Sequence, residues 1–294
     1  MSLYVSTSCL KDEDDIFRVL DSYCSNGISH VELGIGRKPA APLSRIRHYG
    51  FSLLAHHYFP PPRDRFVVNL ASQDAALLAQ SIAQVKRSID FCSRFNIPLF
   101  SFHGGFCADP DSGFCFSGSA RITPYQLAFD TFAASVKEVN SHAQARGVRL
   151  AVENNVLSRS TLRDGGNRLL LLCEAAEFER LWERVASDNI GILLDLGHLR
   201  VSASWLGFDA DAFIEEVKGK ISALHINDND GRSDTHGRVD KGSWCLEAIS
   251  RHHLAGLPVI LESANRTMAE VKEQVGIIED LLGCEKARGA ISYG

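Results

Sequence analysis

Six apolar runs of this chain end in side chains of a kind that commonly bind metal ions. The residues at or just beyond these ends are His56, His57, His103, Glu153, Asp195, His198, His225 and Glu262. If the runs are parallel strands of a closed barrel, their C-terminal ends open on one face, so residues far apart in the sequence converge there. The pattern therefore predicts a site for a divalent metal ion.

Four of these residues form the set that we expect to bind one ion: Glu153, Asp195, His225 and Glu262. Three carboxylates and one imidazole suit manganese, magnesium, cobalt, zinc or iron, and do not discriminate among them. The two glutamates also indicate a mechanism. When a substrate chelates the metal through a carbonyl and a neighbouring hydroxyl, one glutamate removes the adjacent proton and the other returns it.

A second group of residues could bind more metal or contact the substrate. His198 lies three positions after Asp195, and Asp234 and His236 have a spacing that delivers two ligands side by side. His103 and one of His56 and His57 complete the group, because alternation along a strand sends adjacent side chains to opposite faces. The loop after His225 also contains Arg232, Arg238 and Lys241, which could bind a phosphate or carboxylate or remain solvated charges.

Strand-like and helix-like segments alternate along the whole chain without a linker of low complexity. The expected strands are Leu3–Thr7, His30–Leu33, Ser52–His56, Leu99–Phe102, Arg149–Val152, Gly191–Leu194, Ser222–His225 and Pro258–Leu261, each followed by a helix. The clearest helices are Asp74–Phe95, Pro124–Arg146 and Met268–Leu282, the second capped by Thr123 and stopped by Gly147. Eight such rounds predict one (β/α)8 barrel domain over residues 1–294, with a doubly wound sheet as the competitor.

Three connections are longer than plain turns, and all three follow strands that end in candidate ligands. They are Gly104–Thr123, Asn154–Leu169 and Asn227–Trp244. Long loops in compact domains are usually lids or binding loops, so we expect them to roof the pocket. A stretch with three prolines, residues 60–62, follows His57 and is expected to shape the entrance.

Composition narrows the class of protein. Thirty-one basic and 36 acidic residues give a net charge of −5, and no dense basic run indicates nucleic-acid binding. Eight scattered cysteines without a CxxC pair favour reduced thiols, including Cys107 and Cys115, which share a loop. No segment is apolar enough to cross a membrane and no signal peptide is evident, so we expect a cytoplasmic protein.

The motifs AVENN, LLDLGHL, HINDND followed by DTH, and VILES occur in an order that resembles the xylose isomerase-like TIM barrel superfamily. In its isomerase and epimerase branch, the resemblance implies that Glu153, Asp195, His225 and Glu262 bind one metal, with the two glutamates as acid and base. It places His198 near the substrate, and it makes Glu32 either a substrate neighbour or a structural ion pair.

The endonuclease branch of the superfamily uses three zinc ions. The resemblance supplies a counterpart for every ligand: His57 or His56, His103, Glu153, Asp195, His198, His225, Asp234, His236 and Glu262. The segment after His236, HGRVDKGSW, departs from both branches because it lacks their paired-glycine turn. The loops also lack the basic residues expected of a duplex-binding surface.

These observations predict a metal-dependent isomerase or epimerase of a small polyhydroxylated substrate. A multinuclear zinc phosphodiesterase related to the endonucleases is the alternative, as is a dehydratase or lyase that begins with the same proton abstraction. A barrel that binds a sugar without catalysing its conversion has little support from the sequence. We expect no nucleic-acid or membrane partner, and a homo-oligomer remains open.

Overall fold

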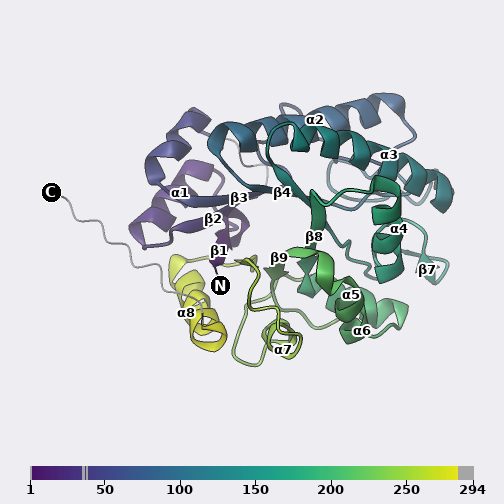
Figure 1. The fold of residues 1–294 in the computed structure, drawn as a ribbon. Helices are drawn as coiled ribbons and strands as arrows, with labels where there is room; N and C mark the ends of the chain where they lie inside the picture. The colour runs from purple at the N-terminus through teal and green to yellow at the C-terminus, as the bar shows by residue number, and fades with distance from the viewer. Residues whose placement is uncertain (1, 35–36, 38, 284–294) are drawn as a thin grey trace.

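The computed structural model describes residues 2–34, 37 and 39–283, in which eight parallel strands close into a barrel (Figure 1). The strands are β1 (Leu3–Ser6), β2 (His30–Leu33), β3 (Ser52–His56), β4 (Leu99–His103), β5 (Arg149–Glu153), β8 (Ile190–Asp195), β9 (Ile221–Ile226) and β10 (Val259–Leu261). The barrel closes where β10 pairs with β1, with Leu3 opposite Val259. The predicted (β/α)8 barrel is therefore confirmed, and a doubly wound sheet is excluded. Eight of the sixteen strand limits move by one residue from those expected, and the other eight agree.

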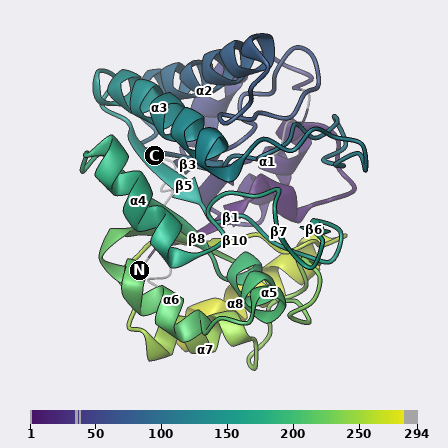
Figure 2. The same ribbon diagram turned by 90° about the vertical axis from the view of Figure 1, so that its right-hand side faces the viewer.

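Helices surround the barrel on its outside (Figures 1 and 2). They are α1 (Ile16–Ser25), α2 (Ala75–Phe95), α3 (Tyr125–Gln144), α4 (Ala175–Val185), α5 (Leu196–Leu206), α6 (Ala210–Val217), α7 (Trp244–Arg251) and α8 (Met268–Leu282), with short 3-10 helices η1 (Thr7–Cys9), η2 (Leu43–Tyr49) and η3 (Lys218–Lys220). The expectation of a helix after every strand is wrong at β2, because the described residues between β2 and β3 contain only the 3-10 helix η2. Pro39 and Pro42 interrupt that segment, and it lacks an apolar face of helical period.

The ends of the helices follow from local capping. The Asp74 side chain accepts from the backbone N–H groups of Ala76 and Leu77 at the start of α2. The expected Thr123 cap of α3 is wrong, because Pro124 has an extended ψ of 132° and itself occupies the cap position. Gly147 follows α3 with a φ of +66°, which agrees with its predicted role as a stop.

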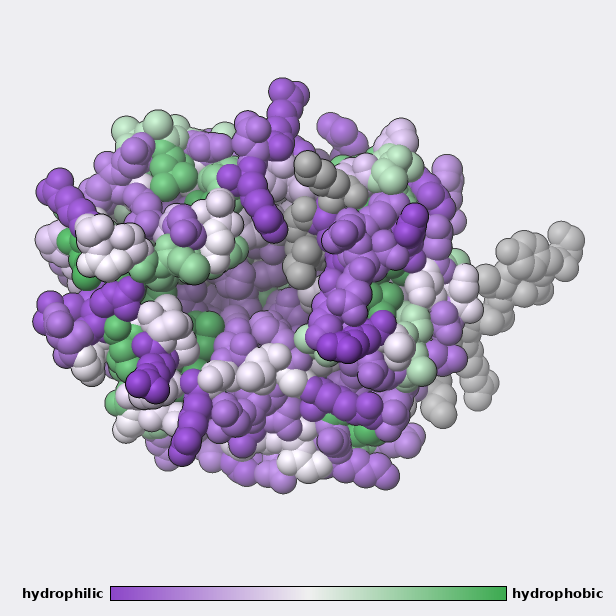
Figure 3. All heavy atoms as spheres, turned by 180° about the vertical axis from the view of Figure 1, so that it is seen from behind, coloured by the Kyte–Doolittle hydropathy of each residue, from purple (hydrophilic) through white to green (hydrophobic). Residues whose placement is uncertain are grey.

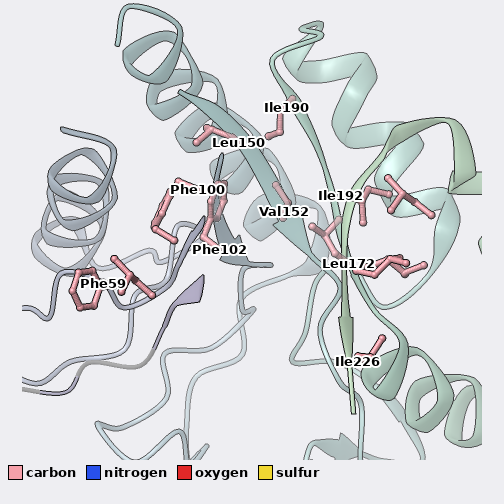
Figure 4. Packing of buried hydrophobic residues seen from close by; sticks show 14 of the residues in the cluster. Phe59, Phe100, Phe102, Leu150, Val152, Leu172, Ile190, Ile192 and Ile226 are labelled. Carbon is pink, nitrogen blue, oxygen red and sulfur yellow. The ribbon is translucent and has the colours of Figure 1, made fainter. Parts of the chain in front are cut away.

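Alternation along the strands separates two cores. Residues whose side chains point outward pack against the helices, among them Phe100, Phe102, Leu150, Val152, Ile190, Ile192 and Ile226 (Figure 4). A second cluster lies inside the barrel: Tyr4, Leu54, Leu99, Ala151, Leu193, Ala223 and Ile260. Two residues further along each strand, the inward positions become polar, as at His56, Glu153 and His225. An apolar plug thus closes the barrel beneath a polar layer at its C-terminal face.

The long connections lie over this face. In Figure 2, the hairpin of β6 (Leu162–Arg163) and β7 (Gly166–Asn167) lies at the opposite side of the molecule from the N-terminus. The connection after β5, expected to be longer than a plain turn, contains this hairpin, and Gly165 turns it with a φ of +78°. Isolated bridges join Phe106 to Leu170 and Asp228 to Gly237. These bridges and the hairpin give the roof of the barrel a defined structure.

Two further expectations concern single features. Cys107 is buried, Cys115 is exposed, and both are free thiols, as expected. Within the described ranges, no helix is long and apolar enough to cross a membrane. The single domain over residues 1–294 stays a prediction, since residues 1, 35, 36, 38 and 284–294 lie outside the described part.

Candidate metal centre

Four side chains converge at the C-terminal ends of β5, β8, β9 and β10. We call Glu153, Asp195, His225 and Glu262 the inner quartet. Their ligand atoms all lie within 4.8 Å of one another. Register explains part of this convergence, because β8 and β9 place Asp195 beside His225, and Glu262 directly follows β10. The structure thus brings together the four residues that the sequence indicates for one metal ion.

Two histidines from the neighbouring strands face the other side of Glu153. We call His56, at the end of β3, and His103, at the end of β4, the flanking pair. His103 Nδ1 lies 2.9 Å and His56 Nε2 lies 3.4 Å from Glu153 Oε2. The three residues form a second group that could hold a metal ion.

A third group lies closer to the mouth of the barrel. We call His198, Asp234 and His236 the outer trio. Asp234 Oδ2 lies 3.4 Å from His198 Nε2 and 3.1 Å from His236 Nε2. His198 belongs to the first turn of α5, whereas Asp234 and His236 come from the loop after β9. The Asp-x-His spacing therefore does place two candidate ligands side by side.

Glu153 connects the inner quartet with the flanking pair. Its Oε1 lies 3.4 Å from His225 Nδ1, while its Oε2 faces His56 and His103. The carboxylate is completely buried, yet neither oxygen makes a hydrogen bond of acceptable geometry. His225 Nδ1 and Asp234 Oδ1 are also buried, and neither has a hydrogen-bond partner among the described residues. Because unpaired buried charge is costly, these atoms fit a bound cation.

Four of the five histidines have one ring nitrogen held by a partner behind the site. His225 Nε2 contacts Glu32 Oε1 at 2.9 Å, and His56 Nδ1 contacts Ser101 Oγ at 2.9 Å. His198 Nδ1 and His236 Nδ1 lie 2.9 Å and 3.0 Å from the carbonyl oxygens of Asn154 and Glu262. Such partners fix the tautomer, so that the second nitrogen faces the centre, as is usual for metal-binding histidines.

The sequence left two roles open for Glu32, a substrate neighbour or a structural ion pair. It is 1% exposed and contacts His225 rather than the cavity, so it orients a candidate ligand. Two asparagines, which the sequence analysis did not single out, orient Asp195. Asn154 exchanges two hydrogen bonds with the Asp195 backbone, and Asn227 Nδ2 lies 3.4 Å from both carboxylate oxygens. A Cβ at Gly197 would lie 2.1 Å from Asn227 Oδ1, so only glycine fits there.

The charges of the centre depend strongly on one another. Burial raises the pKa of Glu153, but His103 and His56 outweigh it and hold the pKa well below its usual range. Glu262 behaves similarly, with its pKa lowered to about 2 despite burial, mainly by His225. Burial raises the pKa of Asp195 in spite of the neighbouring His198. Without a cation, histidine charge balances these carboxylates.

The histidines show the reciprocal effect. Burial would lower the pKa of His225, but Glu32 and Glu262 raise it well above the ordinary value. For His236, Asp234 and Glu262 outweigh burial and raise the pKa to about 10. The site thus attracts positive charge, and a metal ion would replace protons on these imidazoles.

The neighbouring histidines His56 and His57 require a correction. We expected only one of the two side chains to face the pocket, and the sequence left open which one. His56 ends β3 and joins the flanking pair, whereas His57 belongs to none of the candidate metal groups in the described part. Both nevertheless line the cavity, because His57 lies beyond the strand, where alternation no longer applies. Its ring stacks on Tyr58 with a centroid distance of 3.8 Å.

Arg232 and Arg238, which the sequence left open between anion binding and solvated charge, both lie at the surface. Arg232 is exposed, does not line the cavity, and contributes its carbonyl to a hydrogen bond from Trp205. Arg238 pairs with Glu273 on the surface. A cavity of about 1640 Å³ over the candidate ligands is instead lined by Lys11, Arg37, Arg63, Arg65 and Arg87. The run Arg63-Asp64-Arg65 after the prolines was the available signal for two of them.

The face of the molecule that carries the C-terminal ends of the strands is hollowed near its centre, with hydrophilic side chains prominent around the hollow (Figure 3). The cavity reaches the outer trio, the flanking pair and Glu262. A ligand entering it would therefore meet polar groups from several βα connections at once.

Comparison with known proteins places this geometry in context. A sequence profile described as the xylose isomerase-like TIM barrel matches residues 36–283. The chain is 26% identical over 150 residues to a UPF0276 protein of Rhizorhabdus wittichii, covering 48% of this chain and 54% of that one. It thus spans about half the length of that relative. It is 24% identical over 213 residues to the probable endonuclease 4 of Sulfurihydrogenibium sp., covering 67% and 68%.

Solved structures show the same fold. A D-tagatose 3-epimerase-like protein has a TM-score of 0.73 at 17% identity, with 96% of this chain and 97% of that chain covered. The IOLI protein with a zinc atom has a TM-score of 0.70 at 14% identity, with 96% and 98% covered. Sugar epimerases thus resemble the chain in structure, while endonucleases are among its relatives in sequence.

Proposed function

Because the chain belongs to the xylose isomerase-like TIM barrel family, we propose that it is a metal-dependent hydrolase of phosphate esters with three divalent ions in its centre. Of the four clusters of possible metal ligands in the described part, three carry this proposal: the inner quartet, the outer trio, and the flanking pair with Glu153, which the quartet shares. The fourth cluster joins Glu32 to His56 and His225, two ligands that the other clusters already contain. A single-metal site needs the inner quartet alone. It gives no reason for the flanking pair and the outer trio to carry five further ligands.

The position of Glu153 also supports hydrolysis over proton transfer by this residue. A glutamate that moves a proton to or from a substrate carbon needs one oxygen free to reach that carbon. Here Oε1 faces His225 and His198, whereas Oε2 faces His56 and His103. Both oxygens therefore face candidate ligands, as suits a residue that would help to hold metal ions. This geometry leaves no oxygen of Glu153 directed at the cavity.

The reaction would add water to phosphorus and break one P–O bond, with the departing oxygen taking a proton. Divalent ions, when bound, would supply a water that ionises near neutral pH and positive charge opposite the phosphoryl oxygens. The partners of the histidines hold each ring in place. Arg37, which is 8% exposed with an unpaired Nε among the described residues, and Lys11 line the cavity, where they would bind phosphate oxygens.

The favoured substrate is a small molecule. The net charge of −5 does not favour a nucleic-acid duplex, for which a broad basic surface is expected. The basic groups line the cavity itself. The similarity to probable endonuclease 4 therefore supports hydrolysis of a phosphate ester, with a small molecule rather than a duplex as the substrate.

A sugar isomerase or epimerase is the second candidate. The inner quartet has the composition expected for enediolate chemistry, and a D-tagatose 3-epimerase-like protein shares the fold over 96% of the chain. Dehydratase or lyase chemistry would begin with the same proton abstraction. All three reactions require Glu153 or Glu262 to exchange a proton with substrate carbon.

One experiment tests both candidates. The protein as purified is analysed for metal content and assayed with bis(4-nitrophenyl) phosphate, beside Glu153→Gln and the exposed control Glu216→Gln on α6. We expect about three ions per chain and hydrolysis that is lost in Glu153→Gln alone. Deuterium uptake by ketoses in D₂O without any hydrolysis would instead establish the second candidate and contradict the first.

A further inference from the structure

The cavity over the candidate metal centre is also lined by residues that play no part in that centre. They come from the segment between β3 and α2, from α2 itself and from the loop after β4: Tyr58, Pro61, Pro62, Arg63, Arg65, Phe66, Arg87, Phe114 and Phe116. We call this set the arginine arm. It combines positive charge with aromatic surface within the same cavity as the ligand groups.

Eight arginines of the described part pair with a carboxylate, whereas the three arginines of the arm do not. Arg45, Arg146, Arg184, Arg200 and Arg251, among others, each pair with a carboxylate. Within the described ranges, Arg63, Arg65 and Arg87 have no carboxylate within 4.0 Å, the limit for an ion pair. Asp64, which separates two of them in the sequence, does not line the cavity. Three cations thus share one wall without a counter-charge.

Arg87 is fixed in place by neutral groups. Its Nη1 donates to Gln84 Oε1 at 3.1 Å, and its Nη2 donates to the carbonyl of Pro61 at 3.0 Å. Gln84, which is buried, donates in turn to the carbonyl of Pro60 at 2.8 Å. Burial and the neighbouring charge of Arg63 lower the pKa of Arg87. The proline segment and α2 therefore hold like charges near one another.

The aromatic surface comes from Tyr58 and Phe114, whose rings meet edge to face at a centroid distance of 6.0 Å. Phe114 is 51% exposed although it is large and apolar. Its φ of +62° is uncommon for phenylalanine, and the Asp111 side chain stabilises this turn by accepting from Gly113 and Cys115. An exposed ring beside a cavity is a surface that a bound ring can cover.

We propose that the arginine arm is a subsite for an anionic group, phosphate or carboxylate, on a ring-bearing small molecule whose ring packs against Phe114 and Tyr58. The inference rests on the proposed function because it names the class of substrate for that site. The substrate then carries a second anionic group, remote from the bond that is hydrolysed. Arginine suits both anions because its guanidinium forms paired hydrogen bonds with planar or tetrahedral oxyanions.

Calorimetric binding of phenyl phosphate and of benzoate to the purified, metal-containing protein tests the subsite. Arg63→Gln, Arg65→Gln and Arg87→Gln are compared with Arg18→Gln, an exposed arginine of α1 that does not line the cavity. We expect each arm variant to weaken binding of at least one of the anions by about tenfold, the effect of one lost hydrogen bond to a charged group. Preference between the two probes identifies the anion.

Phe114→Ala separates the ring contact from the charge. This substitution should weaken the binding of phenyl phosphate more than the binding of inorganic phosphate. The arginine variants should weaken the binding of both. Unchanged affinities of all three arginine variants, with folding verified by thermal unfolding, would overturn the subsite. Arginine-dependent binding without hydrolysis of bis(4-nitrophenyl) phosphate would contradict only the proposed function.

Discussion

The inner quartet and the outer trio reach the same cavity by different routes. The quartet lies at strand ends, and the side chains of Glu153, Asp195 and His225 are at most 1% exposed. Two members of the trio, Asp234 and His236, come from a loop, with side chains 20% and 33% exposed. Strand register fixes the first group, whereas loop structure places most of the second. The two groups should therefore differ in how strongly they hold a metal ion and tolerate substitution.

Glu153→Gln should have the largest effect, because Glu153 belongs both to the inner quartet and to the group with the flanking pair. We expect loss of two of three ions and a fall in hydrolysis on the order of a thousandfold or more, as for removal of a central catalytic group. Metal analysis and steady-state kinetics measure both. Retention of three ions would show that the carboxylate is not shared.

A fall in pH should reduce metal affinity next most strongly. His236 has its pKa raised to about 10, and the pKa of His225 is also raised, so both are protonated without metal and must lose a proton to bind one. Affinity is therefore greatest at high pH, and it should fall by about tenfold per unit for each proton released as the pH decreases. Titrations between pH 8 and pH 6 in buffers of different ionisation enthalpy measure this release. Affinity independent of pH would contradict it.

Asp234→Asn should separate the two groups. Removing one carboxylate from the outer trio should release one ion and slow hydrolysis by roughly ten- to a hundredfold, with the inner quartet intact. The matched variant Asp230→Asn changes an exposed carboxylate of the same loop and should leave the metal content unaltered. Loss of all ions in Asp234→Asn would mean that the groups do not bind independently.

Glu32→Gln should have the smallest effect of the four. Gln can still accept a hydrogen bond from His225 Nε2, so the ring stays oriented while the charge behind it disappears. We expect metal affinity of the inner quartet to fall by about tenfold, at the low end for a partner behind a ligand. The metal affinity of the Glu32→Ala variant should fall further. If both variants bound metal as tightly as the parent protein, Glu32 would have only a structural role.

The same contrast explains what the sequence could reveal. Glu153, Asp195, His225 and Glu262 end apolar runs, and the two-residue period of a strand sends them inward together, so their convergence was predictable. The outer trio was found through the Asp-x-His spacing and the family resemblance. Its place relative to the quartet depends on a loop whose path no periodicity encodes.

The arginines show more clearly what could not be predicted from the sequence. For Arg232 the sequence left open whether it binds an anion or remains a solvated charge, and the structure exposes it. Arg63, Arg65 and Arg87 come from a proline segment and a helix whose packing depends on Gln84. His56 rather than His57 joins the ligand groups because β3 ends at His56.

Anomalous X-ray diffraction from crystals of the purified protein, recorded at the absorption edges of its metals, tests the central claim most directly. We expect three peaks of anomalous density: one within the inner quartet, one between Glu153 and the flanking pair, and one within the outer trio. A single peak confined to the inner quartet, with His56, His103, Asp234 and His236 bound to none, would contradict the central claim.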